Sequence, residues 1–167
     1  MKAGADAFAD SHHDEEDPDA CKLILYYIVK GSMPDIEFLT PEANTEYQEL
    51  LTVAWCLCHK HAMPKLQNLL MAQLLVLIQE VYTELDDISA AFKKTPAGSS
   101  LRKLMAEQLM CRICMGGLEE WQVLENVSGI EGAMVEIADA SGAYHRDNAV
   151  WNDRAGEQKK QAYMVEE

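Results

Sequence analysis

Prolines and glycines divide this sequence into short segments, and within most segments the apolar residues recur at the spacing of an α-helix. The clearest segment is CKLILYYIVK, residues 21–30, which is apolar on nearly every side and therefore needs cover on every side. Asp17 can cap the start of this helix, Pro18 suits its first turn, and Gly31 can end it in the left-handed conformation. Convincing strand alternation is missing from the sequence, which therefore predicts a mainly α fold with little or no sheet.

The other helices are predicted from caps and breakers. Pro34 and Pro41 indicate a loop, after which Thr45 begins the next helix, with Gln48 completing a capping box. The helices predicted after this loop are 45–61, 64–85, 87–94 capped by Asp86, and 101–115 capped by Ser99 or Ser100 and ended by Gly116, with two further helical pieces at 118–126 and 129–140. Short strands remain conceivable only at residues 36–39 and around Val150.

Charge narrows the range of partners. The chain of 167 residues has the size of one domain, and its formal net charge is −14. Such a surface repels phosphate backbones and anionic lipid head groups, and the basic residues form only short pairs such as Lys93-Lys94. The most apolar window, residues 66–81, is broken by polar side chains and is typical of a core helix. We therefore expect no nucleic-acid binding and no membrane association.

The cysteines indicate the compartment. The chain has five cysteines, and its start lacks the basic residues and apolar stretch of a secretory signal. We therefore expect reduced thiols and an intracellular location, in the cytoplasm or the nucleus.

The stretch CLCHKH brings two cysteines and two histidines together, and CRIC follows later in the chain. Residues two apart on a helix point about 200° apart, so only pairs three apart can face one ion. Cys58 with His61, or Cys56 with His59, could join Cys111 and Cys114 in a tetrahedral zinc site if two helices met there. The competing interpretation, which we favour, is that Cys58 is a small core residue and that the protein has no metal or cofactor.

Signatures of catalysis are weak. Ser99 and Ser100 follow a glycine but lack the second glycine of a nucleophile elbow, and GIEG at residues 129–132 lacks the spacing of a phosphate-binding loop. Paired carboxylates such as Asp86-Asp87 are explained by helix-dipole contacts or solvation. We therefore expect a protein without enzymatic activity.

Two longer segments are similar to a known family. EEDPDACKLILYYIVKGSMPD resembles the later part of a BTB/POZ domain, and ELLTVAWCLCHKHAMPKLQNLLMAQL resembles the helical hairpin that closes it. The following VYTELDDISAAFKKTPAGSSLRKLMAEQL is similar to a segment found after the domain core in fungal BTB proteins, and AYHRD fits a Tyr-His segment of theirs. The strands and helix that open such a domain have no counterpart before Asp17, so the chain resembles a BTB/POZ protein without its N-terminal half.

The resemblance implies a fold and a function. Together with the acidic start and the polar end of the sequence, it divides the chain into an acidic flexible segment (1–16), a BTB/POZ-like helical part (17–85), a C-terminal helical extension (86–142) and a polar, loose tail (143–167). It implies a protein–protein interaction module, an adaptor or assembly domain, whose partner is a second copy or a cullin-type ubiquitin-ligase scaffold. The aromatic candidates for partner contact are Tyr26, Tyr27, Phe38 and Trp55, although for Tyr27 and Trp55 a place in the core is favoured over partner contact. Two alternatives stay open, the zinc-stabilised helical domain and a fragment without independent function.

Overall fold

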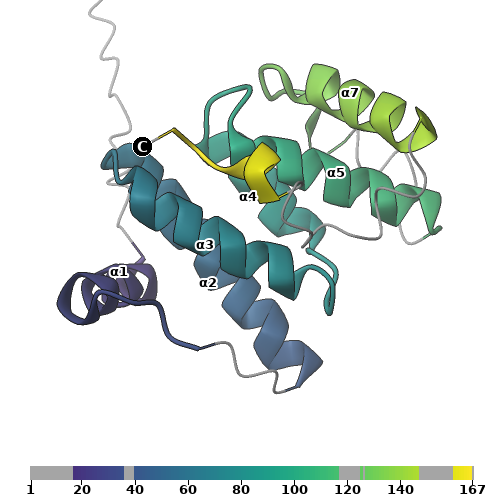
Figure 1. Ribbon diagram of the computed structural model, residues 1–167. Helices are drawn as coiled ribbons and strands as arrows, with labels where there is room; N and C mark the ends of the chain where they lie inside the picture. Colours follow the sequence, from purple (N-terminus) through teal and green to yellow (C-terminus); the bar gives the residue numbers. More distant parts are fainter. Residues whose placement is uncertain (1–16, 36–39, 117–124, 126, 147–159, 167) are drawn as a thin grey trace, which may run out of the picture.

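The computed structural model describes residues 17–35, 40–116, 125, 127–146 and 160–166 (Figure 1). Most of these residues are helical and none of them is in a strand, which confirms the mainly α prediction. The elements are α1 (Pro18–Lys30), α2 (Pro41–Lys60), α3 (Pro64–Leu77), α4 (Leu85–Lys94), α5 (Ser100–Cys114), α7 (Ala133–Arg146) and a 3₁₀ turn, η1 (Gln161–Tyr163). Among these helices none combines the length and apolarity needed to cross a membrane.

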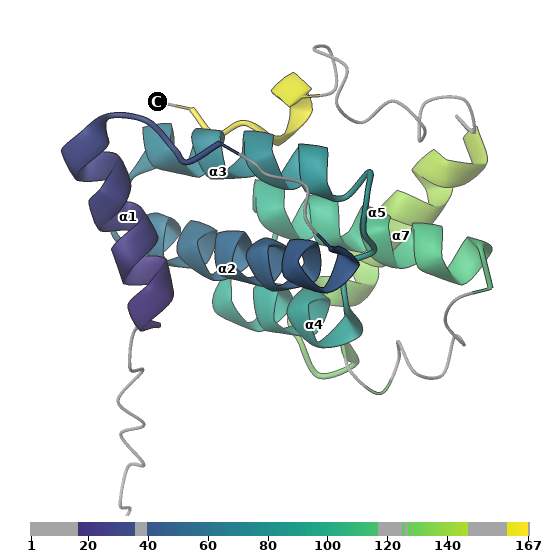
Figure 2. The ribbon, with the colours of Figure 1, turned by 90° about the horizontal axis from the view of Figure 1, so that it is seen from below.

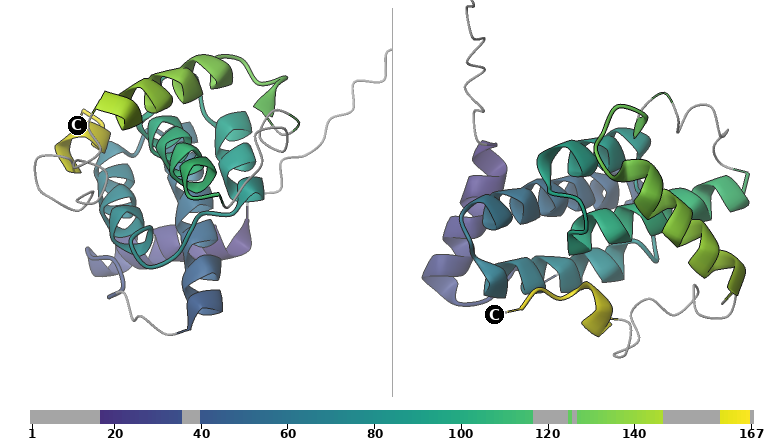
Figure 3. Two further views of the ribbon diagram at one scale, coloured as in Figure 1. Left: turned by 90° about the vertical axis from the view of Figure 1, so that its right-hand side faces the viewer. Right: turned by 90° about the horizontal axis from the view of Figure 1, so that it is seen from above.

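Helices α2 and α3 form an antiparallel pair at the centre of the molecule, and α1 lies crosswise against α2 at one end (Figure 2). Helix α4 packs against α2 and α5, and α7 crosses α5 at the end opposite α1 (Figure 3). This arrangement leaves α1 covered on one side only, because the rest of the bundle lies beyond α2.

The start and end of α1 follow the prediction. The Asp17 carboxylate accepts hydrogen bonds from the backbone N–H groups of Asp19 and Ala20, both at 2.9 Å, and Pro18 occupies the first turn. Gly31 ends the helix with φ at 74°, a left-handed conformation that favours glycine.

The predicted start of α2 at Thr45 is wrong. The helix begins at Pro41, and the Thr40 hydroxyl accepts a hydrogen bond from the backbone N–H of Ala43 at 3.3 Å. Thr45 is already inside the helix, where its hydroxyl donates to the carbonyl of Pro41, and Gln48 is buried and bonds to Thr83. The physical reason is that proline costs no hydrogen bond at the first position of a helix, so Pro41 starts a helix instead of preventing one.

Three other boundaries also differ from the prediction. Helix α3 ends at Leu77 and not near Leu85, because the N–H groups of Glu80 and Val81 turn back to the Leu77 carbonyl. Helix α4 begins at Leu85, before the predicted cap Asp86. Helix α7 continues to Arg146, beyond the predicted end at residue 140. The cap of α5 at Ser99 is confirmed, whereas the pieces predicted at 36–39, 118–126 and Val150 lie wholly or mainly outside the described residues.

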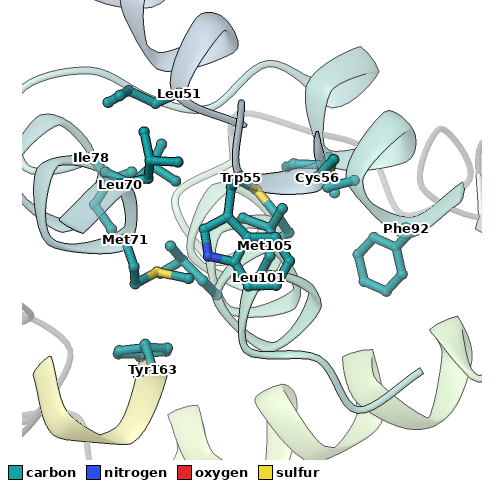
Figure 4. Close-up of a cluster of buried hydrophobic side chains, with 14 of the residues drawn as sticks. Leu51, Trp55, Cys56, Leu70, Met71, Ile78, Phe92, Leu101, Met105 and Tyr163 are labelled. Carbon is teal, nitrogen blue, oxygen red and sulfur yellow. The ribbon is translucent and has the colours of Figure 1, made fainter. Parts of the chain in front are cut away.

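The core surrounds Trp55, which lies beside Leu101 and Met105 of α5 and is 1% exposed (Figure 4). Cys56 and Phe92 lie on one side of this indole, and Met71 and Tyr163 lie on the other. A contiguous cluster of buried apolar residues therefore joins all the described helices, from α1 to α7, and η1.

The segment 160–166 belongs to this core, which differs from the loose tail predicted from Ala143. Tyr163 is buried, and its hydroxyl donates to the Glu107 carboxylate on α5. On α3, the Asn68 side chain donates to the Val165 carbonyl at 3.0 Å and accepts from the Val165 N–H at 2.7 Å. The segment therefore spans α3 and α5 and ties them together.

Candidate functional site

The outward face of α1 is apolar although it faces away from the bundle. Ala20 and Leu23 are buried on the inner face of the helix. On the outer face Leu25 is 58% exposed, Ile28 60% and Val29 78%. Three neighbouring aliphatic side chains on one helix make an apolar patch of the kind that protein contacts cover.

A groove runs beside this patch, between α1 and α2. It has a volume of about 790 Å³. Apolar side chains from both helices line it, among them Leu23, Tyr26, Leu50 and Val53. Tyr26 is 43% exposed and belongs to the groove wall, so the patch and the groove are continuous around one helix.

Hydrogen bonds fix the shape of the groove at the loop that follows α1. The Gln73 side chain on α3 donates to the Pro34 carbonyl at 2.7 Å, and its oxygen accepts from the Tyr47 hydroxyl at 3.1 Å. Burial raises the pKa of Tyr47, so this phenol stays neutral and able to donate. One glutamine therefore holds two lining residues of the groove, Pro34 and Tyr47, in place.

The rim of the groove is acidic. Asp19 pairs with Lys22 at 2.7 Å, and this hydrogen bond and charge raise the pKa of the lysine. Asp17 is occupied as the cap of α1. The other carboxylates of the lining, Asp35, Glu46 and Glu49, are exposed. None of these three forms an ion pair with another residue that the structure describes. The groove therefore presents apolar walls with negative charge at the edge.

The aromatic candidates fall into different environments. Tyr26 lies on the surface of α1, as a contact residue should. Tyr27 is half-buried and packs against the core, and Trp55 is a core residue that stacks on His59 with ring centroids 5.6 Å apart. Phe38 lies outside the described residues. The structure thus leaves Tyr26 as the one of the four that is described and exposed.

The four residues of the zinc alternative are not brought together. Cys58 is fully buried in α2, and burial raises its pKa to about 12. His61 is exposed after the end of α2, and Cys111 and Cys114 lie in the last turn of α5. Within the described part of the chain, no three His, Cys, Asp or Glu side chains converge as metal ligands would. The proposed ligand set therefore has no support from this arrangement.

Sequence reasoning missed the acidic rim and the outward patch. With α2 starting at Pro41, Glu42, Glu46 and Glu49 recur at intervals of four and three residues, which places them on one helix face. The predicted start at Thr45 excluded Glu42 and hid this pattern. The sequence shows that α1 is apolar on nearly every side, and this includes Leu25, Ile28 and Val29. It does not show that these aliphatic residues, and not the aromatic ones alone, are exposed.

Comparisons with known proteins give no relative: no family model matches the chain, and neither the curated proteins nor the solved structures contain a significant match.

Proposed function

We propose that this protein is a non-enzymatic protein-interaction module that binds its partner through the outward face of α1. The observation that carries the proposal is the exposure of Leu25, Ile28 and Val29 on a helix that is anchored from its other side. Covering one aliphatic side chain contributes about 1.5–3 kcal/mol. A partner that covers three of them can therefore gain a useful share of its affinity here.

The rest of the molecule supports a binding role for α1. One buried cluster, which includes Ala20 and Leu23 of α1, holds the helices together, so the exposed side chains of α1 can contact a partner without the core being opened. All five cysteines are free thiols, which suits a protein that works in the reducing cytoplasm or nucleus. The resemblance of residues 15–35 to a BTB/POZ domain points to the same class of function, with a cullin-type scaffold or a second copy as partner.

The experiment compares two double variants. Leu25→Gln with Val29→Gln makes the α1 patch polar with a good helix former. Met134→Gln with Val135→Gln makes the same change on α7, where Met134 is 44% exposed and Val135 65%. Quantitative affinity capture with mass spectrometry then identifies proteins retained by the wild type.

We expect the α7 variant to retain the same partners and the α1 variant to lose them. Retention by both variants would refute the assignment to α1. Sedimentation velocity of the wild type tests a second copy as the partner. A cooperative thermal melt, followed by circular dichroism, is expected for all three proteins, whereas a fragment without independent function would melt broadly.

A further inference from the structure

We infer that the partner inserts a basic segment with large apolar side chains into the groove between α1 and α2. This inference rests on the proposed function and adds the chemistry of the partner. It follows from the composition of the groove, whose walls carry Leu23, Tyr26, Leu50 and Val53 and whose rim carries Asp35, Glu46 and Glu49.

Shape requires the apolar part of the partner. The groove volume of about 790 Å³ lies within the range of roughly 300–1,000 Å³ that is usual for ligand pockets. Leu50 and Val53 lie one turn apart on α2, so their side chains follow each other along the groove. Two or three aliphatic or aromatic side chains, spaced as on one face of a helix, fit such walls.

Charge requires the basic part of the partner. Asp35, Glu46 and Glu49 are exposed carboxylates without ion pairs to other described residues, and the whole chain carries −14. Lysine or arginine at the edge of the inserted segment would pair with them and would also be steered to the groove by the overall field. An acidic segment would be repelled by these three carboxylates.

The same charge argues against the chain filling its own groove. A second copy carries the same net charge of −14, so the charge of the whole molecule opposes its approach to this acidic rim. Residues 1–16 contain five acidic residues and one lysine, so this segment is also repelled. A different, basic protein is therefore the occupant that the groove fits.

The test measures the binding of three labelled peptides to the full chain by fluorescence anisotropy at physiological salt. The first peptide is an amphipathic helix of leucine and lysine. In the second, glutamine replaces leucine, and in the third, glutamate replaces lysine. We expect the leucine–lysine peptide to bind, the glutamine–lysine peptide to bind at least tenfold more weakly, and the leucine–glutamate peptide not to bind.

Two charge variants separate the groove from the general negative field. Glu46→Gln with Glu49→Gln removes two charges from the rim, whereas Glu131→Gln, just before α7, with Asp139→Asn, in α7, removes two charges at the end of the molecule opposite α1 (Figure 2). We expect the rim variant to bind the leucine–lysine peptide about tenfold more weakly than the wild type does. The Glu131/Asp139 variant should change this affinity less than twofold. Equal weakening by both variants would show diffuse attraction and overturn the inference, as would binding of the leucine–glutamate peptide.

The two proposals can fail separately. If the capture experiment depends on Leu25 and Val29 while the peptide affinities follow net charge alone, the interaction role stands and the basic partner does not. If the peptide binds at the rim as expected but no captured protein depends on the α1 patch, the groove chemistry stands and the use of that patch does not.

Discussion

The guanidinium of Arg102 donates from Nε to the Glu136 carboxylate at 2.8 Å, and this ion pair fastens α7 to α5. The Arg102 side chain is only 3% exposed and also donates to the carbonyls of Thr95, at 3.3 Å, and Glu131, at 2.5 Å. The guanidinium further lies 4.8 Å from the centre of the Phe92 ring. One side chain of α5 thus binds the end of α4, the turn before α7 and α7 itself.

Replacing Arg102 with alanine should destabilise the fold strongly. The change leaves the Glu136 carboxylate in a mostly buried position and removes the donors to two carbonyls, and breaking such a buried pair costs about 3–5 kcal/mol. Urea unfolding followed by circular dichroism measures this loss. Glu136→Gln is the matched control, because its amide oxygen can still accept from Arg102, and we expect a smaller loss. A loss below about 1 kcal/mol for Arg102→Ala would contradict the structural role.

Asp87 should make the free energy of unfolding depend on pH. Burial, followed by the charges of Glu49 and Glu84, raises its pKa from 3.8 to about 6. Because the folded state holds this proton more tightly than the unfolded state, the contribution of Asp87 to stability falls as pH rises between these two values. Above pH 6 the penalty of the ionised form is fully present.

Asp87→Asn removes this penalty. We expect the variant to be more stable than the wild type at pH 7.5, by less than about 1 kcal/mol because the carboxyl is only half-buried, and to lose this advantage at pH 4. Urea unfolding at the two pH values checks the difference. An advantage that is the same at both pH values would show that the effect does not come from ionisation.

The cysteines should differ in how fast they react with an alkylating reagent. Burial raises the pKa of Cys56 to about 11 and that of Cys58 to about 12, so both thiols are inaccessible and protonated. Cys114 is exposed on α5. In iodoacetamide labelling at pH 8 followed by mass spectrometry, we expect Cys114 to react at least tenfold faster than Cys58. Labelling in 8 M urea is the control, since all five thiols should then react alike.

Asn68→Ala should release the segment that follows Lys160. The change removes both hydrogen bonds to Val165, which together contribute about 1–3 kcal/mol. Amide hydrogen exchange at Val165 should accelerate by about the corresponding factor of five or more, while the exchange of α5 amides changes little. Lys65→Ala, at an exposed position on the same helix, should leave the exchange of Val165 unchanged.

The parts of this fold that could be predicted are those set by local chemistry. Asp17, Pro18 and Gly31 bound α1 through their own side chains or backbone freedom, so three residues sufficed. Two local signals compete for the start of α2, proline at Pro41 and a capping box at Thr45. The helix begins at Pro41. The end of α3 at Leu77 coincides with a turn at residues 78–80, and neither glycine nor proline marks it in the sequence.

The candidate site and the docked segment depend on residues far apart in the sequence. Gln73 reaches Pro34, which is 39 positions away, and Arg102 reaches Glu136 across 34 positions. The residue pattern within one segment does not predict which glutamine or arginine forms such a long-range hydrogen bond. The packing of the helices determines which residues come within reach of each other. The apolar excess of α1 was visible in the sequence, but which of its faces stays exposed was not.

The bond between Asn68 and Val165 links residues 97 positions apart, and this separation has a consequence for the order of folding. The α2–α3 pair closes a loop of a few residues, so its formation costs little chain entropy and can come early. The docking of Val165 must wait until α3 and α5 offer a surface, and it gains only a short segment of contacts in return. We therefore expect this segment to be the last to join the structure on folding and the first to leave it on unfolding.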